Sequence, residues 1–222
     1  MSVERLDYPD ATILMHVTSQ PERDMRIRSV EKERETIEFL SSLDPCVVFD
    51  IGANVGAYAF VAASLGHKVY AFEPPGPTFE RLEANIDLNP ELGVFAYDVL
   101  LGDSNAAVDF SLSSLEPGAA LHALGGGGQH VRRLEMKTLD LVVATLNLPY
   151  PEAMKIDVDG NELRVLLGAE ICLSHCLSLQ VETDDDLPMS QQVEPFLEAR
   201  GFKVTDRRRH GSGPISNVRF SK

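Results

Sequence analysis

Alternating apolar and polar stretches between residues 46 and 73 predict a strand, a turn, a helix and a second strand. The apolar run 47–49 ends at a carboxylate, Asp50, and a short turn containing glycine follows. Apolar residues then recur at helical spacing over 58–65, and a second apolar run ends at Glu73. A β-α-β unit of this kind pairs its strands in parallel and commonly binds a nucleotide at their carboxyl ends.

Further apolar runs extend this unit into a larger α/β arrangement. Short apolar runs alternate with segments whose apolar residues lie at helical spacing, which is typical of a mostly parallel sheet with helices on both faces. Two apolar runs near the end flank a basic turn and predict a closing antiparallel hairpin. Beyond the first unit, we expect strands at 92–101, 107–112, 131–136, 153–158, 176–181, 202–205 and 215–220, and helices at 79–89, 138–146, 162–170 and 190–200.

Residues 1–44 precede the first strand and are expected to form an N-terminal arm followed by one amphipathic helix. In the segment 21–43, apolar residues lie at helical intervals with charges between them. Such a helix covers one face of the sheet or closes over the ligand as a lid, and the sequence leaves both open. The first 20 residues are expected to pack over the core or to form a dimer contact. Residues 45–222 would then be the main domain.

A run of four glycines, Gly125–Gly128, lies between the strands expected at 107–112 and 131–136. Four consecutive glycines do not hold one backbone shape without help, because each has wide conformational freedom. The run therefore predicts either a substrate-gating loop or an ordinary flexible surface loop.

Composition and charge narrow the class of protein. The chain of 222 residues carries 34 acids and 20 bases, a net charge of −14, so nucleic-acid phosphates would be repelled. No apolar run reaches the roughly 18 residues that a membrane span needs, and residues 1–20 lack the pattern of a secretory signal. Three cysteines, an odd number, favour a reduced, cytoplasmic protein. We therefore expect neither a nucleic-acid nor a membrane partner.

The turn after the first strand carries the pattern Asp50-x-Gly52-x-Asn54-x-Gly56. A dinucleotide turn needs three glycines to admit a pyrophosphate, and here the third is absent while Asp50 would repel phosphate. A cationic ligand with an amino group and a ribose suits the turn better, and S-adenosylmethionine (SAM) is such a ligand. Glu73, at the end of the second strand, is placed to accept hydrogen bonds from both ribose hydroxyls.

Polar residues at the ends of later strands complete the predicted site. Asp157 and Lys155 occur in a buried parallel strand, where they are tolerated at the carboxyl end that faces the cofactor. Asp157 is the first candidate for a catalytic base and Glu182 is the second, while Lys155 is expected to pair with a neighbouring carboxylate. Asp98 would lie near the adenine. The acidic run 157–162 lacks the rest of a calcium loop, so no metal ligand is assigned; a magnesium ion stays open, although no motif supports it.

Two cysteines, Cys172 and Cys176, flank Ser174 and His175 and resemble half of a zinc site. A structural zinc site needs four ligands, and the chain offers no second pair of cysteines. A zinc site is therefore not predicted.

Several segments together resemble the FkbM family of SAM-dependent methyltransferases. They are VVFDIGANVGAYAFVAASLGHKVYAFEP, ERLEANIDLN, LLGD, KTLD, MKIDVDGNELRVLLGAE and LSLQVE, and they span residues 47–182 in order. The resemblance implies a Rossmann-like class I methyltransferase fold, with a seven-stranded sheet of order 3-2-1-4-5-7-6 and strand 7 antiparallel. It also implies O-methylation of hydroxyls on sugars, polyketides or related small molecules. Asp159 stands where the family usually carries Glu.

The sequence therefore predicts a SAM-dependent O-methyltransferase that acts on a small-molecule acceptor. Two other functions stay open at this point. A nicotinamide-dependent oxidoreductase uses the same β-α-β unit, although the missing third glycine argues against it. A non-catalytic SAM-binding or scaffold protein would keep the fold without the chemistry.

Overall fold

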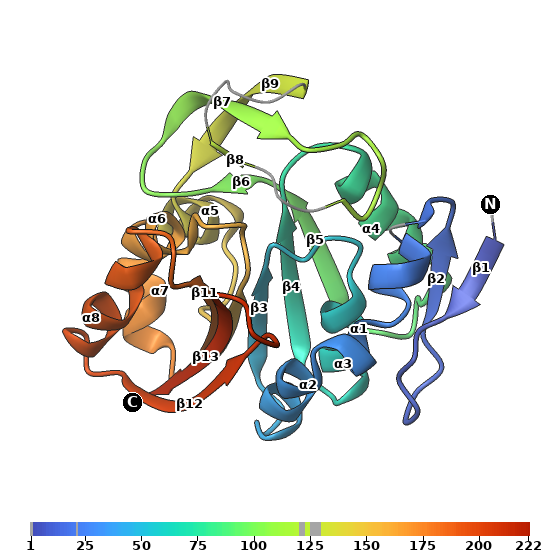
Figure 1. Ribbon diagram of the computed structural model, residues 1–222, viewed down its shortest axis with the longest axis horizontal. Coiled ribbons are helices and arrows are strands. Elements are labelled where there is room, and N and C mark those ends of the chain that lie inside the picture. The colour runs from blue at the N-terminus through green and yellow to red at the C-terminus, as the bar shows by residue number, and fades with distance from the viewer. Residues whose placement is uncertain (1, 21, 120–122, 125–129) are drawn as a thin grey trace.

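A computed structural model describes residues 2–20, 22–119, 123–124 and 130–222, and a seven-stranded sheet forms its centre (Figure 1). The strands are β3 (Val47–Ile51), β4 (Lys68–Glu73), β5 (Val94–Asp98), β10 (Ala153–Ile156), β11 (Ser178–Asp184), β12 (Lys203–Arg209) and β13 (Ile215–Ser221). Their order is β12-β13-β11-β10-β3-β4-β5, and β13 runs antiparallel to both of its neighbours. This is the order 3-2-1-4-5-7-6 with an antiparallel strand 7, so the expected fold class is confirmed.

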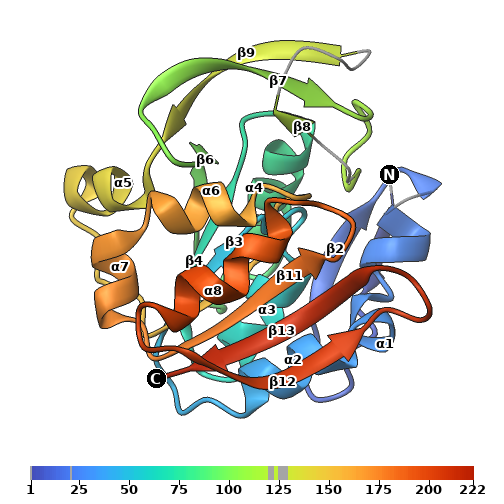
Figure 2. The ribbon, with the colours of Figure 1, turned by 60° about the vertical axis from the view of Figure 1, so that its left-hand side comes forward.

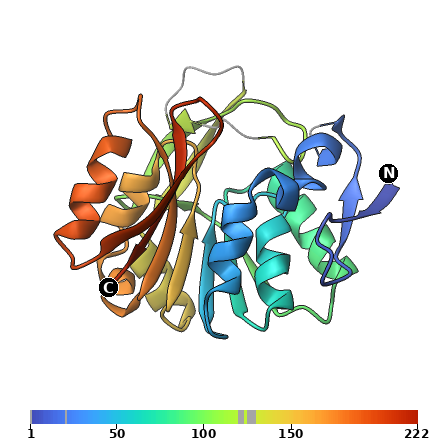
Figure 3. The ribbon, with the colours of Figure 1, turned by 60° about the horizontal axis from the view of Figure 1, so that its bottom comes forward.

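Helices cover both faces of this sheet (Figure 3). The helices on one face are α5 (Leu139–Leu146), α6 (Glu162–Leu167), α7 (Glu170–His175) and α8 (Val193–Glu198), which follows a 3₁₀ turn, η2 (Ser190–Gln192). The helices on the other face are α2 (Arg34–Ser41), α3 (Ala57–Ser64) and α4 (Pro77–Leu88). The hydroxyl of Thr138 accepts a hydrogen bond from the N–H of Leu141 and so caps the start of α5, which confirms the helix expected at 138–146.

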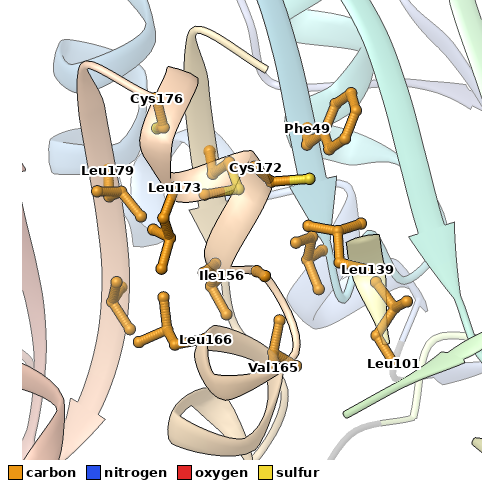
Figure 4. Packing of buried hydrophobic residues seen from close by; sticks show 14 of the residues in the cluster. Phe49, Leu101, Leu139, Ile156, Val165, Leu166, Cys172, Leu173, Cys176 and Leu179 are labelled. Carbon is orange, nitrogen blue, oxygen red and sulfur yellow. The ribbon is translucent and has the colours of Figure 1, made fainter. Parts of the chain in front are cut away.

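Two hydrophobic clusters, one on each face, hold these layers together. Side chains alternate along a strand, so Phe49 packs into the cluster beneath α5 to α8 while Val48 packs into the other. Figure 4 shows Phe49 in the first cluster with Cys172 of α7 and Cys176, which directly follows this helix. Both thiols are free and buried among apolar side chains.

The prediction of one amphipathic helix over residues 21–43 is wrong. The chain instead forms a hairpin of β1 (Ser2–Arg5) and β2 (Leu14–Val17), a π-helix η1 (Glu22–Arg26), α1 (Ser29–Lys32) and α2. Side-chain carboxylates accept hydrogen bonds from backbone N–H groups and so interrupt what would otherwise be one continuous helix. Glu22 accepts the N–H groups of Thr18 and Ser19, and Asp7 accepts those of Val30 and Glu31. The apolar residues of these elements pack in the same cluster as α3 and α4.

The strand expected at 92–101 is split between two sheets. After β5, the chain enters a four-stranded sheet of order β6-β9-β7-β8, which lies beyond the carboxyl ends of the main strands (Figure 2). Its strands are β6 (Leu100–Leu101), β7 (Ala106–Leu112), β8 (Ala123–Leu124) and β9 (His130–Lys137), which confirms the strands expected at 107–112 and 131–136. The glycine run Gly125–Gly128 lies outside the described residues.

Three further strands end elsewhere than expected, and pairing with β13 explains two of them. β12 runs on to Arg209, so the three arginines expected in the basic turn lie in this strand instead. β10 ends at Ile156, while β11 runs on to Asp184 because β13 pairs with it along its whole length. Across the described ranges, no helix combines the length and apolar character that a bilayer span demands.

Candidate functional site

A cavity of about 390 Å³ lies at the carboxyl ends of β3, β4, β10 and β11. Ligand-binding clefts commonly have volumes of about 300–1,000 Å³, so a small molecule fits. The N-terminal segment and the small sheet form two of its walls. The lining residues used below are Met25, Arg26, Lys32, Glu33, Ile51, Gly52, Asn54, Phe72, Glu73, Val99, Leu100, Leu101, Phe110, Leu124, Asp157, Asp159, Glu182 and His210.

The turn between β3 and α3 is held tightly against the end of β4. The N–H groups of Gly52 and Ala53 both donate to the carbonyl of Phe72. Gly52 has φ +78°, and a Cβ there would lie 1.8 Å from the carbonyl oxygen of Asp157. Only glycine fits such a close approach. The turn therefore sets the distance between the first strand and the β10 terminus that carries Asp157.

Glu73 ends β4 with its carboxylate at the cavity wall. The N–H of Asn54 donates to Glu73 Oε2 at 3.0 Å. Glu73 is only 5 % exposed, and this burial raises its pKa to about 8. A buried carboxylate beside a glycine turn can accept hydrogen bonds from a ligand's paired hydroxyls.

Asp157 follows β10 and shares a buried cation with Asp50 of β3. Lys155 Nζ lies 3.2 Å from Asp157 Oδ2 and 3.4 Å from Asp50 Oδ1, which confirms the predicted pairing of Lys155 with a neighbouring carboxylate. Burial opposes ionisation of Asp157, but the charge and hydrogen bond of Lys155, together with the charges of Arg26 and Lys32, outweigh it and lower the pKa of this carboxyl. Asp50 has the opposite shift, because burial raises its pKa more than Lys155 lowers it. Asp157 is therefore ionised at neutral pH.

Glu182, within β11, lies on the same side of the cavity as Asp157. Burial, followed by the charges of Asp157 and Glu33, raises the pKa of Glu182 to about 9. His210, in the hairpin between β12 and β13, places Nδ1 3.8 Å from Glu182 Oε2 and Nε2 3.0 Å from Glu35 Oε1. Asp157 is thus ionised at neutral pH, whereas Glu182, like Glu73, keeps its proton.

The structure brings together five of the eight residues that the sequence singled out. These are Gly52, Asn54, Glu73, Asp157 and Glu182.

The other three, Asp50, Gly56 and Asp98, are absent from the described cavity lining. Asp50 is buried behind it against Lys155, and Asp98 is exposed at the end of β5. A Cβ on Gly56 would lie 2.6 Å from Leu82, so this glycine serves the packing of α4 on the turn. Their predicted contacts with a cofactor stay predictions.

Several lining residues escaped the sequence analysis. Arg26 and Glu33 come from the N-terminal segment, which carries no recognisable motif. Phe110 and Leu124 come from the small sheet, whose place above the cavity is a tertiary feature. His210 follows three arginines in the predicted hairpin. This run predicted a basic turn, but nothing in it indicated that His210 would line the site.

Residues 50–204 match the family model of the methyltransferase FkbM domain. The chain belongs to this family. Membership implies SAM as the cofactor, while the contacts predicted between SAM and the turn after β3 stay predictions.

Two relatives illustrate the sequence similarity. The chain is 31 % identical over 147 residues to the hexuronic acid methyltransferase AglP of Haloferax volcanii, a match that covers 64 % of this chain and 59 % of that protein. It is 28 % identical over 236 residues to the 31-O-demethyl-FK506 methyltransferase FkbM of Streptomyces tacrolimicus, covering 91 % and 90 %. A match to the antimetabolite synthetase AmbE of Pseudomonas aeruginosa covers only 10 % of that protein. The chain thus spans well under two thirds of some of its curated relatives.

Solved structures share the fold at low sequence identity. The precorrin-6y C5,15-methyltransferase of Geobacter metallireducens superposes with a TM-score of 0.55 at 14 % identity, covering 94 % of this chain and 93 % of that one. The magnesium protoporphyrin IX methyltransferase of Synechocystis, solved with bound SAM, gives 0.52 at 12 % identity, covering 93 % and 86 %. These likenesses show a Rossmann-like methyltransferase architecture.

The described cavity lining suits a cationic ligand better than a phosphate. It carries five acidic side chains, Glu33, Glu73, Asp157, Asp159 and Glu182, and two basic ones with permanent charge, Arg26 and Lys32. Asp157 is ionised, and protonated Glu73 and Glu182 lose their protons more readily beside a cation, so a sulfonium and an ammonium are favoured over phosphates. Apolar side chains at Phe72, Val99, Leu100 and Leu101 offer a surface for a flat heterocycle.

Proposed function

We propose that this protein transfers the methyl group of SAM to a hydroxyl oxygen of a small-molecule acceptor. Family membership supports methyl transfer, and the cavity supports the assignment of roles. The observation that carries the proposal is that Glu73, a buried acid suited to a ribose, and Asp157, an ionised carboxylate, face one cavity.

In this proposal, residues at the ends of β3 and β4 and at the start of the small sheet hold the cofactor. Glu73 accepts the ribose hydroxyls, while Gly52 and Asn54 shape the wall beside the methionine part. Val99 and Leu100 supply apolar contact for the adenine. When bound, SAM supplies a methyl carbon that its sulfonium already activates, so alignment of the acceptor oxygen provides much of the rate.

Asp157 is proposed to take the proton of the acceptor hydroxyl. Its low pKa keeps it ionised at neutral pH, as a base must be. Glu182, whose pKa is raised to about 9, is protonated there and can donate a hydrogen bond to the acceptor. Two carboxyls whose environments drive their pKa values apart are a recurring basis for divided acid and base roles.

The acceptor class is proposed from the relatives. AglP and FkbM are named for a hexuronic acid and for 31-O-demethyl-FK506, so both compounds belong in an acceptor panel with neutral sugars. Release of S-adenosylhomocysteine would be measured for each. Binding of SAM without turnover on any panel member would instead favour a non-catalytic SAM-binding protein.

The test of the catalytic role is Asp157→Asn, which keeps the size of the side chain and removes its charge. We expect turnover to fall by about 100-fold or more, since general base catalysis contributes about 10²–10⁴. SAM affinity, measured by calorimetry beside NAD as the rival ligand, should stay within about threefold. Asp109→Asn, an exposed carboxylate of β7, is the matched control. Unchanged turnover in Asp157→Asn would reject the assignment.

A further inference from the structure

Lys155 is a buried cation in the middle of the main sheet. It is 3 % exposed and lies in β10, in register with Asp50 of β3 and Gln180 of β11. Neighbouring residues in register project from the same face of a sheet, so a row of polar groups crosses three strands beneath α2 and α3. A lysine here is costly without compensation, and the proposed roles above give it no task.

The contacts of Lys155 join two functional segments. Its Nζ reaches Asp50 at the end of β3 and Asp157 just after β10, at 3.4 and 3.2 Å, and lies 5.2 Å from the ring centre of Tyr58 in α3. Within the described residues, neither oxygen of Asp50 has a hydrogen bond. The ion pair with Lys155 is thus the main compensation for burying Asp50.

We propose that Lys155 is a positioning residue for methyl transfer. The ammonium group of Lys155 holds the Asp157 carboxylate toward the cavity, and Asp50 holds that ammonium group in place. This inference rests on the proposed role of Asp157 as the base. It also gives Asp50 a different task from the cofactor contact expected from the sequence, because Asp50 acts through Lys155 from behind the cavity wall.

The charges around Asp157 explain why it needs this support. Acids from three other elements act on this region: Glu33 before α2, Glu162 of α6 and Glu182 of β11. Cations reach it from Lys155, Arg26 and Lys32, and Tyr58 and Asp50 also face Lys155. Among the cations, only Lys155 both contacts the Asp157 carboxylate and is buried.

Removal of Lys155 would therefore leave Asp157 among like charges. With its carboxylate 28 % exposed, Asp157 would be free to turn or to take up a proton. Opposite charges at such distances shift carboxyl pKa values by about one to three units. The base would then be unavailable at neutral pH although SAM could still bind.

Three variants separate this role from a general structural one. Lys155→Met removes the charge, Lys155→Arg restores a cation, and the double variant Asp50→Asn, Lys155→Met avoids leaving Asp50 buried without a partner. The exposed Lys203→Met of β12 is the matched control. Circular dichroism and thermal unfolding identify the variants that fold.

Two readouts test the proposal on the full chain. The first is the carboxyl ¹³C titration of Asp157, assigned with Asp157→Asn, and the second is the acid limb of the kcat profile against pH. In Lys155→Met and the double variant, both midpoints should rise by about one pH unit or more. The kcat at neutral pH should fall by about tenfold or more, with SAM affinity within about threefold. Lys155→Arg should return the two midpoints and the kcat at least part of the way to the wild-type values.

The outcomes distinguish this inference from the proposed function. An unshifted Asp157 titration in folded variants without Lys155 would overturn the positioning role, whatever the activity. A shifted titration in a protein that methylates no acceptor would uphold the coupling between Lys155 and Asp157 and overturn the proposed function. A fall in kcat with no change in either midpoint would assign Lys155 to structure alone.

Discussion

Glu73 should make the free protein less stable as the pH rises, and Glu73→Gln should remove this effect. Burial raises the pKa of Glu73 from 4.5 to about 8. Between these values the native state keeps the proton and the unfolded chain releases it, so the native state binds more protons. Stability from this group is therefore full below about pH 4.5 and is lost progressively as the pH rises to about 8.

The magnitude follows from the size of the shift. Each pKa unit corresponds to about 1.4 kcal/mol, so Glu73 costs the native state about 3 kcal/mol at pH 7 relative to pH 4.5. Glutamine resembles the protonated acid in shape and can accept the N–H of Asn54. Glu73→Gln should thus match the wild type near pH 4.5 and exceed its unfolding free energy by about 3 kcal/mol at pH 7.

The same substitution should weaken the binding of SAM. The amide keeps only one acceptor oxygen, and a hydrogen bond between neutral groups contributes about 0.5–1.5 kcal/mol, so affinity should fall by about 2- to 10-fold. Urea unfolding between about pH 5 and pH 8 gives the difference in unfolding free energy between Glu73→Gln and the wild type. Glu162 and Glu182 also have raised pKa values, but both proteins retain these residues, so their contributions cancel in the difference. Calorimetry gives the affinity. Glu80→Gln, an exposed acid of α4, is the control.

Two results would refute this reasoning. A stability difference that does not change between about pH 5 and pH 8 would mean that Glu73 ionises as freely in the fold as in the unfolded chain. Unchanged SAM affinity in Glu73→Gln would mean that this carboxylate does not hold the ribose.

Three further substitutions or probes test the packing around the site. Gly52→Ala should lower the free energy of unfolding by about 2–3 kcal/mol or more and reduce SAM binding, because a Cβ has no room there and φ is +78°. Gly93→Ala is the control in urea unfolding and should be close to neutral, because the space around Gly93 is open. Arg81→Leu should cost about 3–5 kcal/mol, because it leaves the buried carboxylate of Glu22 without its cation, and a loss below about 1 kcal/mol would contradict this. Burial raises the pKa of the Cys172 thiol, so mass spectrometry should find it alkylated only as fast as the chain unfolds.

The β-α-β unit was predictable because its signals are local. An apolar run, a turn that needs positive φ at Gly52, helical spacing and an acid at the end of β4 all lie within 28 consecutive residues, Cys46 to Glu73. Glu73 and Asp157 were predicted at the site because each stands at the carboxyl end of a parallel strand, and these ends meet at one edge of the sheet. The closing hairpin likewise followed from two apolar runs and the basic turn between them.

The N-terminal segment was mispredicted because contacts distant in sequence override its helical spacing. The apolar residues that recur at helical spacing in this segment do face the core, as that spacing predicts. Around the break between η1 and α1, the buried Glu22 of η1 pairs with Arg81 of α4, and Asp7 binds the start of α1. A pattern of single residues carries no information about such partners.

The sequence by itself determined the fold class, the glycine turn after the first strand and the two acids, Glu73 and Asp157, that face the cavity. The tertiary structure alone decided that Asp50 lies behind the wall against Lys155, that His210 enters the site from the hairpin, and that Glu33 lines it. The physical reason is the range of the interactions. Periodicity and turn geometry act between near neighbours in the chain, whereas strand register and the pairing of buried charges arise only when distant strands pack side by side.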